Sequence, residues 1–190
     1  MHAENPSDWV RRFAPLIRPR SRALDLAAGG GRHTRLLLDM GLNVTAIDRN
    51  IDFLHGFAGS GCDLRQIDLE TGDPDSVMAR LGGGYDGIVV TNYLHRPLLR
   101  PLAAALAPAG VLIYETFMVG NERFGRPRNP DFLLRPGELL DAFAALTIVA
   151  FEQGEVTRPR PAMIQRIAAI AGPLGRLPAA PHLDSDRMPE

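Results

Sequence analysis

The feature that most constrains the fold of this chain is an apolar run that ends in a turn of very small residues. Residues 23–26 read as a buried strand, residues 27–31 (Ala-Ala-Gly-Gly-Gly) as the turn, and residues 32–40 as a helix. Alanine and glycine keep side chains out of the turn, so its backbone N–H groups can approach a bound molecule closely. This succession favours an open α/β sheet with a binding site at its edge.

A second strand ends in an acidic residue. Residues 43–48 form this strand, and Asp48 follows Asp25 by 23 residues. A carboxylate there can accept hydrogen bonds from both hydroxyls of a ribose. Taken alone, the glycine-rich run is compatible with a simple tight turn, and Asp48 with a solvated strand end. The two together, after successive strands, predict a site for an adenosine-containing cofactor at the edge of the sheet.

The rest of the chain alternates in the same way. Strands are expected near residues 22–26, 43–48, 63–67, 85–91, 110–116, 147–153 and 162–171, and helices near 7–17, 32–40, 50–58, 74–81, 97–107 and 137–146. The pattern predicts a doubly wound, Rossmann-like sheet of seven mostly parallel strands with helices on both faces. We expect one domain over residues 1–176 and a disordered tail over residues 177–190.

Composition excludes several classes of protein. The 190 residues suffice for one core. We find no apolar run of about 18 residues and no secretion signal, which predicts a cytoplasmic protein that does not bind membranes. A net charge of −1 gives no overall attraction to nucleic acid. The single cysteine, Cys62, allows no internal disulfide and no cysteine-based metal site, and we expect no metal.

All 21 basic side chains are arginine. With frequent alanine, glycine and proline, this indicates a GC-rich bacterial coding bias. An arginine at any one position is therefore less informative than usual. The lack of lysine in the sequence also excludes a mechanism through a lysine Schiff base.

Residues 25–31 resemble the first motif of the class I S-adenosylmethionine-dependent methyltransferases, an acidic residue followed by glycines at alternate positions. Asp25 matches the acidic position, and Gly29 and Gly31 match the second and third glycines. Ala27 replaces the first glycine and is expected to fit with a negative φ. The dinucleotide fingerprint fits less well, because Thr34 stands where its last glycine belongs.

The resemblance continues along the chain, from about residue 20 to residue 170. Asp68 matches the acidic residue that contacts the adenine amino group in this family, which places Leu69 beside the ring. Residues 85–93 resemble the fourth motif. Residues 106–113 resemble the following turn and fifth strand, with Ala109 in place of a glycine. In this family the last strand is inserted antiparallel. Size and layout resemble the small, single-domain tellurite-resistance type.

The resemblance implies a methyltransferase that moves the methyl group of S-adenosylmethionine directly, in line, to a small-molecule acceptor. The cofactor-binding residues that it implies are Asp25, Ala27, Ala28, Gly29, Gly31, Asp48, Arg49, Asp68, Leu69 and Asn92.

Polar residues at the end of the fourth strand are the catalytic candidates. Asn92, Tyr93 and His95 are expected to orient the acceptor against the methyl group, and His95 to remove a proton if the acceptor carries one. Tyr93 is also compatible with a core position and His95 with a surface position before a helix. The sequence after Asn92 lacks the Pro-Pro-aromatic pattern of base or amide N-methylation, which disfavours that substrate class.

A long connection over residues 117–135 leaves the carboxyl edge after the fifth strand and is expected to close over the acceptor. Its arginines favour an anionic acceptor, although a solvated surface loop is the alternative. The expected substrate-binding residues are Tyr114, Glu115, Arg123 and Arg126.

Three alternatives stay open. A non-catalytic cofactor-binding partner subunit fits the motifs as well as an enzyme does. An NAD-dependent oxidoreductase is disfavoured by Thr34, by Asp68 and by the lack of a second domain for the substrate. The aromatic stripe of helix 7–17 favours core packing, and the alternative is that this helix closes over the cofactor. The identity of the acceptor and the oligomeric state do not follow from the sequence.

Overall fold

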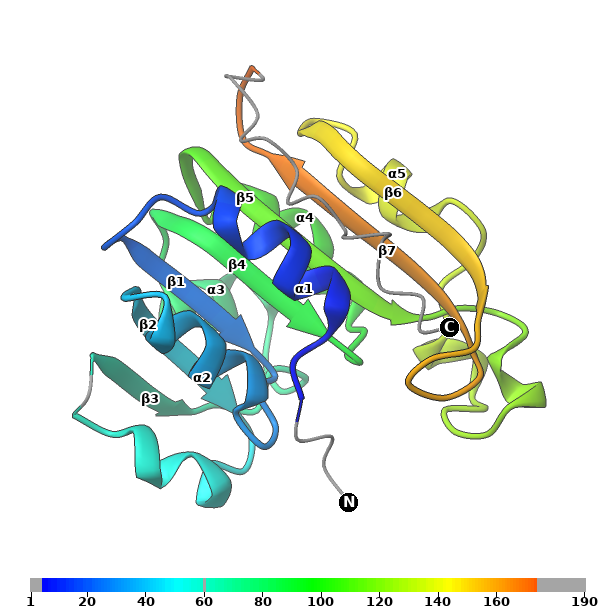
Figure 1. Cartoon of the computed structure of the whole chain (residues 1–190), viewed down its shortest axis with the longest axis horizontal. Coiled ribbons are helices and arrows are strands. Elements are labelled where there is room, and N and C mark those ends of the chain that lie inside the picture. Colours follow the sequence, from blue (N-terminus) through cyan, green and yellow to red (C-terminus); the bar gives the residue numbers. More distant parts are fainter. Residues whose placement is uncertain (1–4, 60, 174–190) are drawn as a thin grey trace, which may run out of the picture.

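The computed structural model describes residues 5–59 and 61–173 and contains one seven-stranded sheet in the order β3-β2-β1-β4-β5-β7-β6 (Figure 1). Strands β1 to β5 pair in parallel, and β7 lies antiparallel between β5 and β6. The strands are β1 (Arg22–Leu26), β2 (Asn43–Asp48), β3 (Cys62–Gln66), β4 (Tyr85–Thr91), β5 (Leu106–Phe117), β6 (Thr147–Val156) and β7 (Ala162–Ile170). The predicted doubly wound sheet with an inserted antiparallel last strand is confirmed.

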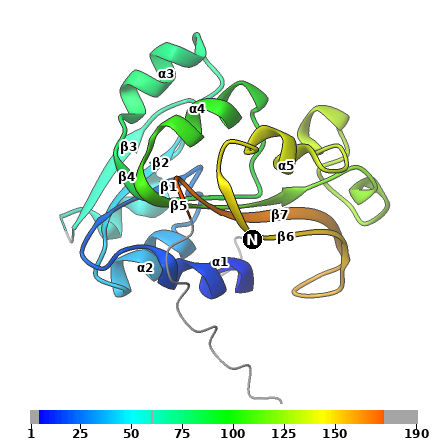
Figure 2. The same ribbon diagram turned by 90° about the horizontal axis from the view of Figure 1, so that it is seen from above.

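Helices cover both faces of the sheet. Helices α1 and α2 lie on one side, and α3, α4 and α5 lie on the other (Figure 2). Their bounds are α1 (Asp8–Phe13), α2 (Arg32–Asp39), α3 (Pro74–Leu81), α4 (Leu99–Ala104) and α5 (Glu138–Ala142). Every residue of β4 is buried, as expected for a central parallel strand that is covered on both faces.

Alternate residues of the central strands enter two separate cores. Ile88 and Leu112 join the cluster beneath α3, α4 and α5, whereas Val89 and Ile113 pack with Trp9 of α1. The side-chain period of two in a strand produces this division. The aromatic stripe of the first helix is therefore core packing, as the sequence favoured. Trp9 also donates its indole N–H to the Ile167 carbonyl at 3.2 Å.

Several expected helices differ from the structure. The first helix is α-helical only to Phe13 and continues as a 3-10 turn over Ala14–Leu16, because Pro15 has no N–H to donate. The expected helix at 50–58 is a 3-10 segment, Asp52–Phe57. The expected helix at 97–107 ends at Ala104, since Leu106 already pairs with Tyr85 at the start of β5.

The last expected helix, 137–146, is shorter in the structure, where α5 ends at Ala142. The proposed tail at 177–190 lies outside the described residues. Within residues 5–59 and 61–173, no helix is long and apolar enough to cross a membrane.

Candidate cofactor and acceptor site

The small-residue turn lies at the carboxyl end of β1, beside β2. Ala28 N–H donates to the Ile47 carbonyl and Gly31 N–H to the Ala28 carbonyl, both at 2.9 Å. Gly31 has a φ of +76°, and a Cβ there would lie 2.5 Å from the Phe57 ring. Both the backbone conformation and the available space therefore require glycine at the start of α2.

The expectation of a negative φ at Ala27 is wrong. Its φ is +55°, close to the +56° of Gly29. Alanine keeps the left-handed conformation of the glycine that it replaces, at a cost of about 1–2 kcal/mol. Such strain persists where the surrounding structure imposes it, and it is common at ligand-binding turns.

Asp48 connects the second strand to this turn. One of its carboxylate oxygens accepts from Gly29 N–H at 2.8 Å, and the other accepts from Asn50 N–H at 3.0 Å. The neighbouring Arg49 is exposed, and its carbonyl accepts from Gln66 Nε2. The two features that the sequence paired, the turn and the acidic strand end, are thus in direct contact.

Asp68 lies at the same edge, one strand further. Ile67 N–H donates to the Asp48 carbonyl at 3.0 Å, which extends the pairing of β2 and β3 to the residue before Asp68. The Asp68 side chain is exposed and accepts from Glu70 N–H at 3.0 Å. Leu69 is buried in the core cluster against which Ala27 also packs.

Asp25 lies beneath the turn. Its carboxylate is fully buried and accepts from the Thr34 hydroxyl at 2.6 Å. Burial raises the pKa of Asp25 to about 6, and the hydrogen bonds from Thr34 limit this rise. In the sequence, Thr34 served only as a departure from the dinucleotide fingerprint. In the structure it is the hydrogen-bond partner of Asp25, the acidic residue of the first motif.

The backbone after β4 is fixed at two points. Asn92 has a φ of +55°, and its N–H donates to the Glu115 carbonyl at 2.9 Å. The carbonyl of Tyr93 accepts from Tyr114 Oη at 2.8 Å. Tyr114, an expected substrate contact, is buried, and this bond engages its hydroxyl inside the protein. The Asn92 side chain is exposed.

Tyr93 is half-buried, and its hydroxyl oxygen has no hydrogen-bond partner within the described parts of the chain. Burial, followed by the negative charges of Glu70, Asp68 and Asp48, raises the pKa of Tyr93 well above its usual value. The phenol is therefore protonated at neutral pH. His95 is half-buried, and its carbonyl accepts from Leu98 N–H. It therefore precedes a helical turn, which is the position that the sequence offered as the alternative to a catalytic role.

Arg96, which the sequence did not single out, ties the end of β4 to the loop over residues 117–135. Its guanidinium donates to both carboxylate oxygens of Glu138, at 2.6 and 3.1 Å. It also donates to the carbonyls of Asp131 and Leu133, both at 2.7 Å. These bonds raise the pKa of Arg96 and, against the effect of burial, lower that of Glu138.

The loop itself is closed at its base. Met118 and Leu134 form an isolated parallel β-bridge. The buried Asn121 side chain accepts from Met163 N–H of β7 at 3.2 Å. Arg123 lies 3.8 Å from Glu155 of β6, an exposed pair. Arg126 is exposed. The loop is therefore an ordered structure that packs on the β6–β7 hairpin.

The N-terminal segment passes across the same edge. Ser7 N–H donates to His33 Nε2 at 3.1 Å, and the Ser7 hydroxyl donates to Glu115 at 2.8 Å. Glu115 also accepts from Arg166 of β7 at 3.2 Å. Glu115, expected to bind substrate, thus holds the segment before α1. No short-range pattern in the sequence links these residues, because they are far apart along the chain.

His33 is neutral in this network. Burial, together with the charge of Arg32, lowers the pKa of His33 to about 3. Since Nε2 accepts from Ser7, the ring proton is on Nδ1, which lies 3.3 Å from the Thr91 hydroxyl.

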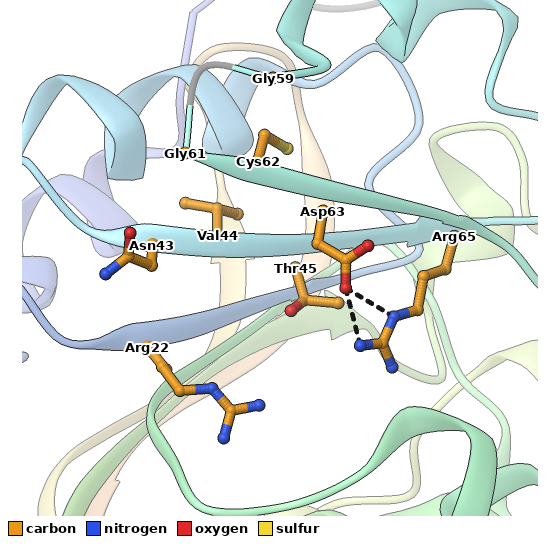
Figure 3. Close-up of a pocket in the computed structure, with 9 residues that line it drawn as sticks. All are labelled: Arg22, Asn43, Val44, Thr45, Gly59, Gly61, Cys62, Asp63 and Arg65. Atoms are coloured by element: carbon orange, nitrogen blue, oxygen red, sulfur yellow. Dashed lines mark hydrogen bonds and ion pairs between the residues drawn. The ribbon is translucent and has the colours of Figure 1, made fainter.

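An open hollow of about 490 Å³ lies at the opposite edge of the sheet, where β1, β2 and β3 begin (Figure 3). Asp63 and Arg65 form an ion pair there at 2.7 Å. Arg65 also donates to the carbonyls of Arg80 and Leu81 at the end of α3. The site residues predicted from the sequence do not line this hollow. Its two arginines are engaged by the protein itself, because Arg22 donates to the Gly83 carbonyl at 3.1 Å and Arg65 pairs with Asp63.

Comparisons with known proteins agree with the resemblance read from the sequence. No protein-family model matches the chain. It is 29% identical over 126 residues to a ubiquinone biosynthesis O-methyltransferase of Xanthomonas campestris pv. campestris, covering 61% of this chain. The chain spans about half the length, 51%, of the curated relatives it matches.

Solved structures are similar over most of the chain. TehB from Haemophilus influenzae matches with a TM-score of 0.69 at 20% identity, covering 87% of this chain and 62% of TehB. A 1,6-didemethyltoxoflavin-N1-methyltransferase from Burkholderia thailandensis, with 1,6-didemethyltoxoflavin and S-adenosylhomocysteine bound, matches with a TM-score of 0.59 at 23% identity. The match covers 85% of this chain and 75% of the other. The expected fold is therefore confirmed: this chain has the fold of the class I S-adenosylmethionine-dependent methyltransferases.

Proposed function

We propose that this chain is an S-adenosylmethionine-dependent methyltransferase with a small-molecule acceptor. The observation that carries the proposal is the contact between Asp48 and the turn, 2.8 Å from the Gly29 nitrogen to the Asp48 carboxylate, at an edge that also holds Asp68. The fold and the curated O-methyltransferase relatives support it.

The residues at this edge suit the cofactor chemically. The half-buried Asp48 carboxylate can accept the ribose hydroxyls, and Asp68 has an exposed carboxylate for the adenine amino group. The left-handed turn over residues 27–31 keeps side chains away from the amino-acid part of the ligand. The buried Tyr93 hydroxyl, for which the described residues offer no partner, adds a polar group that a ligand can satisfy. When bound, S-adenosylmethionine supplies a sulfonium methyl group that is already activated towards nucleophiles.

The task of the protein is then to place the acceptor and exclude water. Asn92 and the segment around Ser7 flank the ends of β4 and β5, where we place the acceptor. Alignment of the acceptor atom, the methyl carbon and the sulfur at near-attack distance lowers the barrier of such a transfer. Neutral His33 is fully engaged by Ser7 and Thr91, so His95 is the histidine that we propose as a base for a protonated acceptor.

We propose that the acceptor is anionic, with Arg126 as its loop contact. Arg126 is exposed, whereas Arg123 faces Glu155 and the Gly120 carbonyl. An arginine that no described residue engages retains its donors for a carboxylate or phosphate. The named activity of the curated relatives, O-methylation, makes anionic phenols the first acceptors to screen.

The test is a binding titration followed by turnover. We expect the purified chain to bind S-adenosylhomocysteine and not NAD, and to label an acceptor from methyl-labelled S-adenosylmethionine. Binding without turnover over a broad acceptor panel would favour the non-catalytic partner subunit. Binding of NAD in place of S-adenosylhomocysteine would refute the proposal.

A further inference from the structure

The three tyrosines of the chain differ in how their hydroxyls are satisfied. Tyr85 Oη donates to the Leu81 carbonyl at 2.6 Å, and Tyr114 Oη donates to the Tyr93 carbonyl at 2.8 Å. Tyr93 Oη is also buried, but no partner for it lies among the residues that the structure describes. A buried donor without an acceptor is unfavourable, so its retention calls for a functional reason.

Packing places the Tyr93 ring on the same side of the sheet as Leu69. The Tyr93 ring packs against the core cluster that contains Leu69, and Ala27 of the turn packs against the same cluster. The backbone around it is held by the Asn92–Glu115 and Tyr114–Tyr93 hydrogen bonds. The side chain therefore lies on the α3 face of the sheet. The Ser7–His33 network is on the other side, where Ala28 and Leu37 join the α1 core.

The charged groups that act on the pKa of Tyr93 are mostly negative. The carboxylates of Glu70, Asp68 and Asp48 act on its hydroxyl, and Arg49 is the cation that opposes them. A protonated phenol that bonds to none of the described residues keeps its O–H free to donate to a ligand. Adenine offers ring nitrogens that accept and an amino group that donates, which complements the Tyr93 hydroxyl and the exposed Asp68 carboxylate at the same edge of the sheet.

We propose that the Tyr93 hydroxyl donates a hydrogen bond to the nucleoside part of the bound cofactor. This inference rests on the proposed function, and it moves Tyr93 from the acceptor, where the sequence placed it, to the cofactor. Tyr93 then helps to select an adenine nucleoside and has no part in methyl transfer itself.

Tyr93→Phe tests the contact with two ligands that share the nucleoside. S-Adenosylhomocysteine carries the amino-acid part, and 5′-methylthioadenosine does not. We expect calorimetry to show both ligands binding about 3- to 10-fold more weakly, by the same factor. The free variant should unfold at a temperature no lower than the wild type, because the lost hydroxyl leaves no described partner unsatisfied.

Tyr85→Phe is the matched control, since it removes a buried hydroxyl that has a partner far from the site. It should lower the unfolding temperature and leave both affinities unchanged. The proposal is overturned if Tyr93→Phe behaves like this control, or if only the KM of the acceptor changes. If the wild-type chain binds neither ligand, both the proposed function and this contact are refuted. If Tyr93→Phe binds both ligands as tightly as the wild type, only the contact is refuted.

Discussion

The two halves of the carboxyl edge are built in different ways. At the proposed cofactor end, the ends of β1, β2 and β3 are joined by hydrogen bonds from main-chain N–H groups, such as Gly29 N–H to the Asp48 carboxylate and Ile67 N–H to the Asp48 carbonyl. At the proposed acceptor end, the contacts join side chains far apart in the sequence: Ser7 and Glu115 are 108 residues apart. The first half depends mainly on hydrogen bonds from main-chain N–H groups, whose positions follow from the fold. The second half depends on particular side chains that a different sequence could replace.

This difference predicts where substitutions cost most stability. Arg96→Ala should lower the free energy of unfolding by about 2–4 kcal/mol, because it leaves Glu138 and two backbone carbonyls unpaired. Urea denaturation measures the change. Arg123→Ala is the matched control: its pair with Glu155 is exposed and should contribute less than about 1 kcal/mol. Equal losses of unfolding free energy in the two variants would mean that the hydrogen bonds of Arg96 contribute no more than an exposed ion pair.

The Ser7–His33 contact predicts a pH dependence of stability. Because the pKa of His33 is lowered to about 3 from 6.5, the unfolded chain takes up a proton first as the pH falls. The contribution of His33 is present above its unfolded pKa and declines by about 2 kcal/mol between pH 7 and pH 5. Asp25 acts in the opposite sense, since its raised pKa of about 6 favours the folded state as the pH falls.

His33→Asn therefore isolates the pH-dependent contribution of His33 to the free energy of unfolding. We expect the stability difference between wild type and variant to shrink as the pH falls from 7 to 5, as measured by urea denaturation at each pH. A constant difference over this range would contradict a buried, neutral His33 and weaken the account of the N-terminal segment.

The smallest expected effect lies in the loop over residues 117–135. Arg126→Gln should raise the KM of an anionic acceptor by about 3- to 10-fold and leave the affinity for S-adenosylhomocysteine unchanged. Arg80→Gln, an exposed arginine on α3, is the control. Equal losses of acceptor and cofactor binding in Arg126→Gln would instead make the loop part of the cofactor site, and the two halves would not be separable.

The same division explains how much the sequence could predict. Strand positions, the turn, and the edge positions of Asp48 and Asp68 follow from local apolar periodicity and small-residue spacing, and the structure brings them together. The left-handed φ of Ala27 was missed, because alanine alone favours a negative φ and only the surrounding fold imposes the opposite.

The acceptor half could not be predicted in the same way. The partners of Glu115, Ser7 and Arg166, come from the two ends of the described chain, and no local pattern connects them. The role of Arg96 could not be recognised from the sequence, because every basic side chain of the protein is arginine and a single arginine does not indicate a special function. Its partner, Glu138, is found only when β4 and α5 are placed side by side.

The central claim is that this edge binds an adenosine-containing cofactor through Asp48. Calorimetric titration of S-adenosylhomocysteine into the wild type, Asp48→Ala and the exposed control Asp39→Ala tests it most directly. We predict binding by the wild type and the control. Asp48→Ala should lose about 1.5–3 kcal/mol, roughly 10- to 150-fold in affinity, with its charge-assisted acceptor. Unchanged affinity in Asp48→Ala, or no binding by the wild type, would contradict the account.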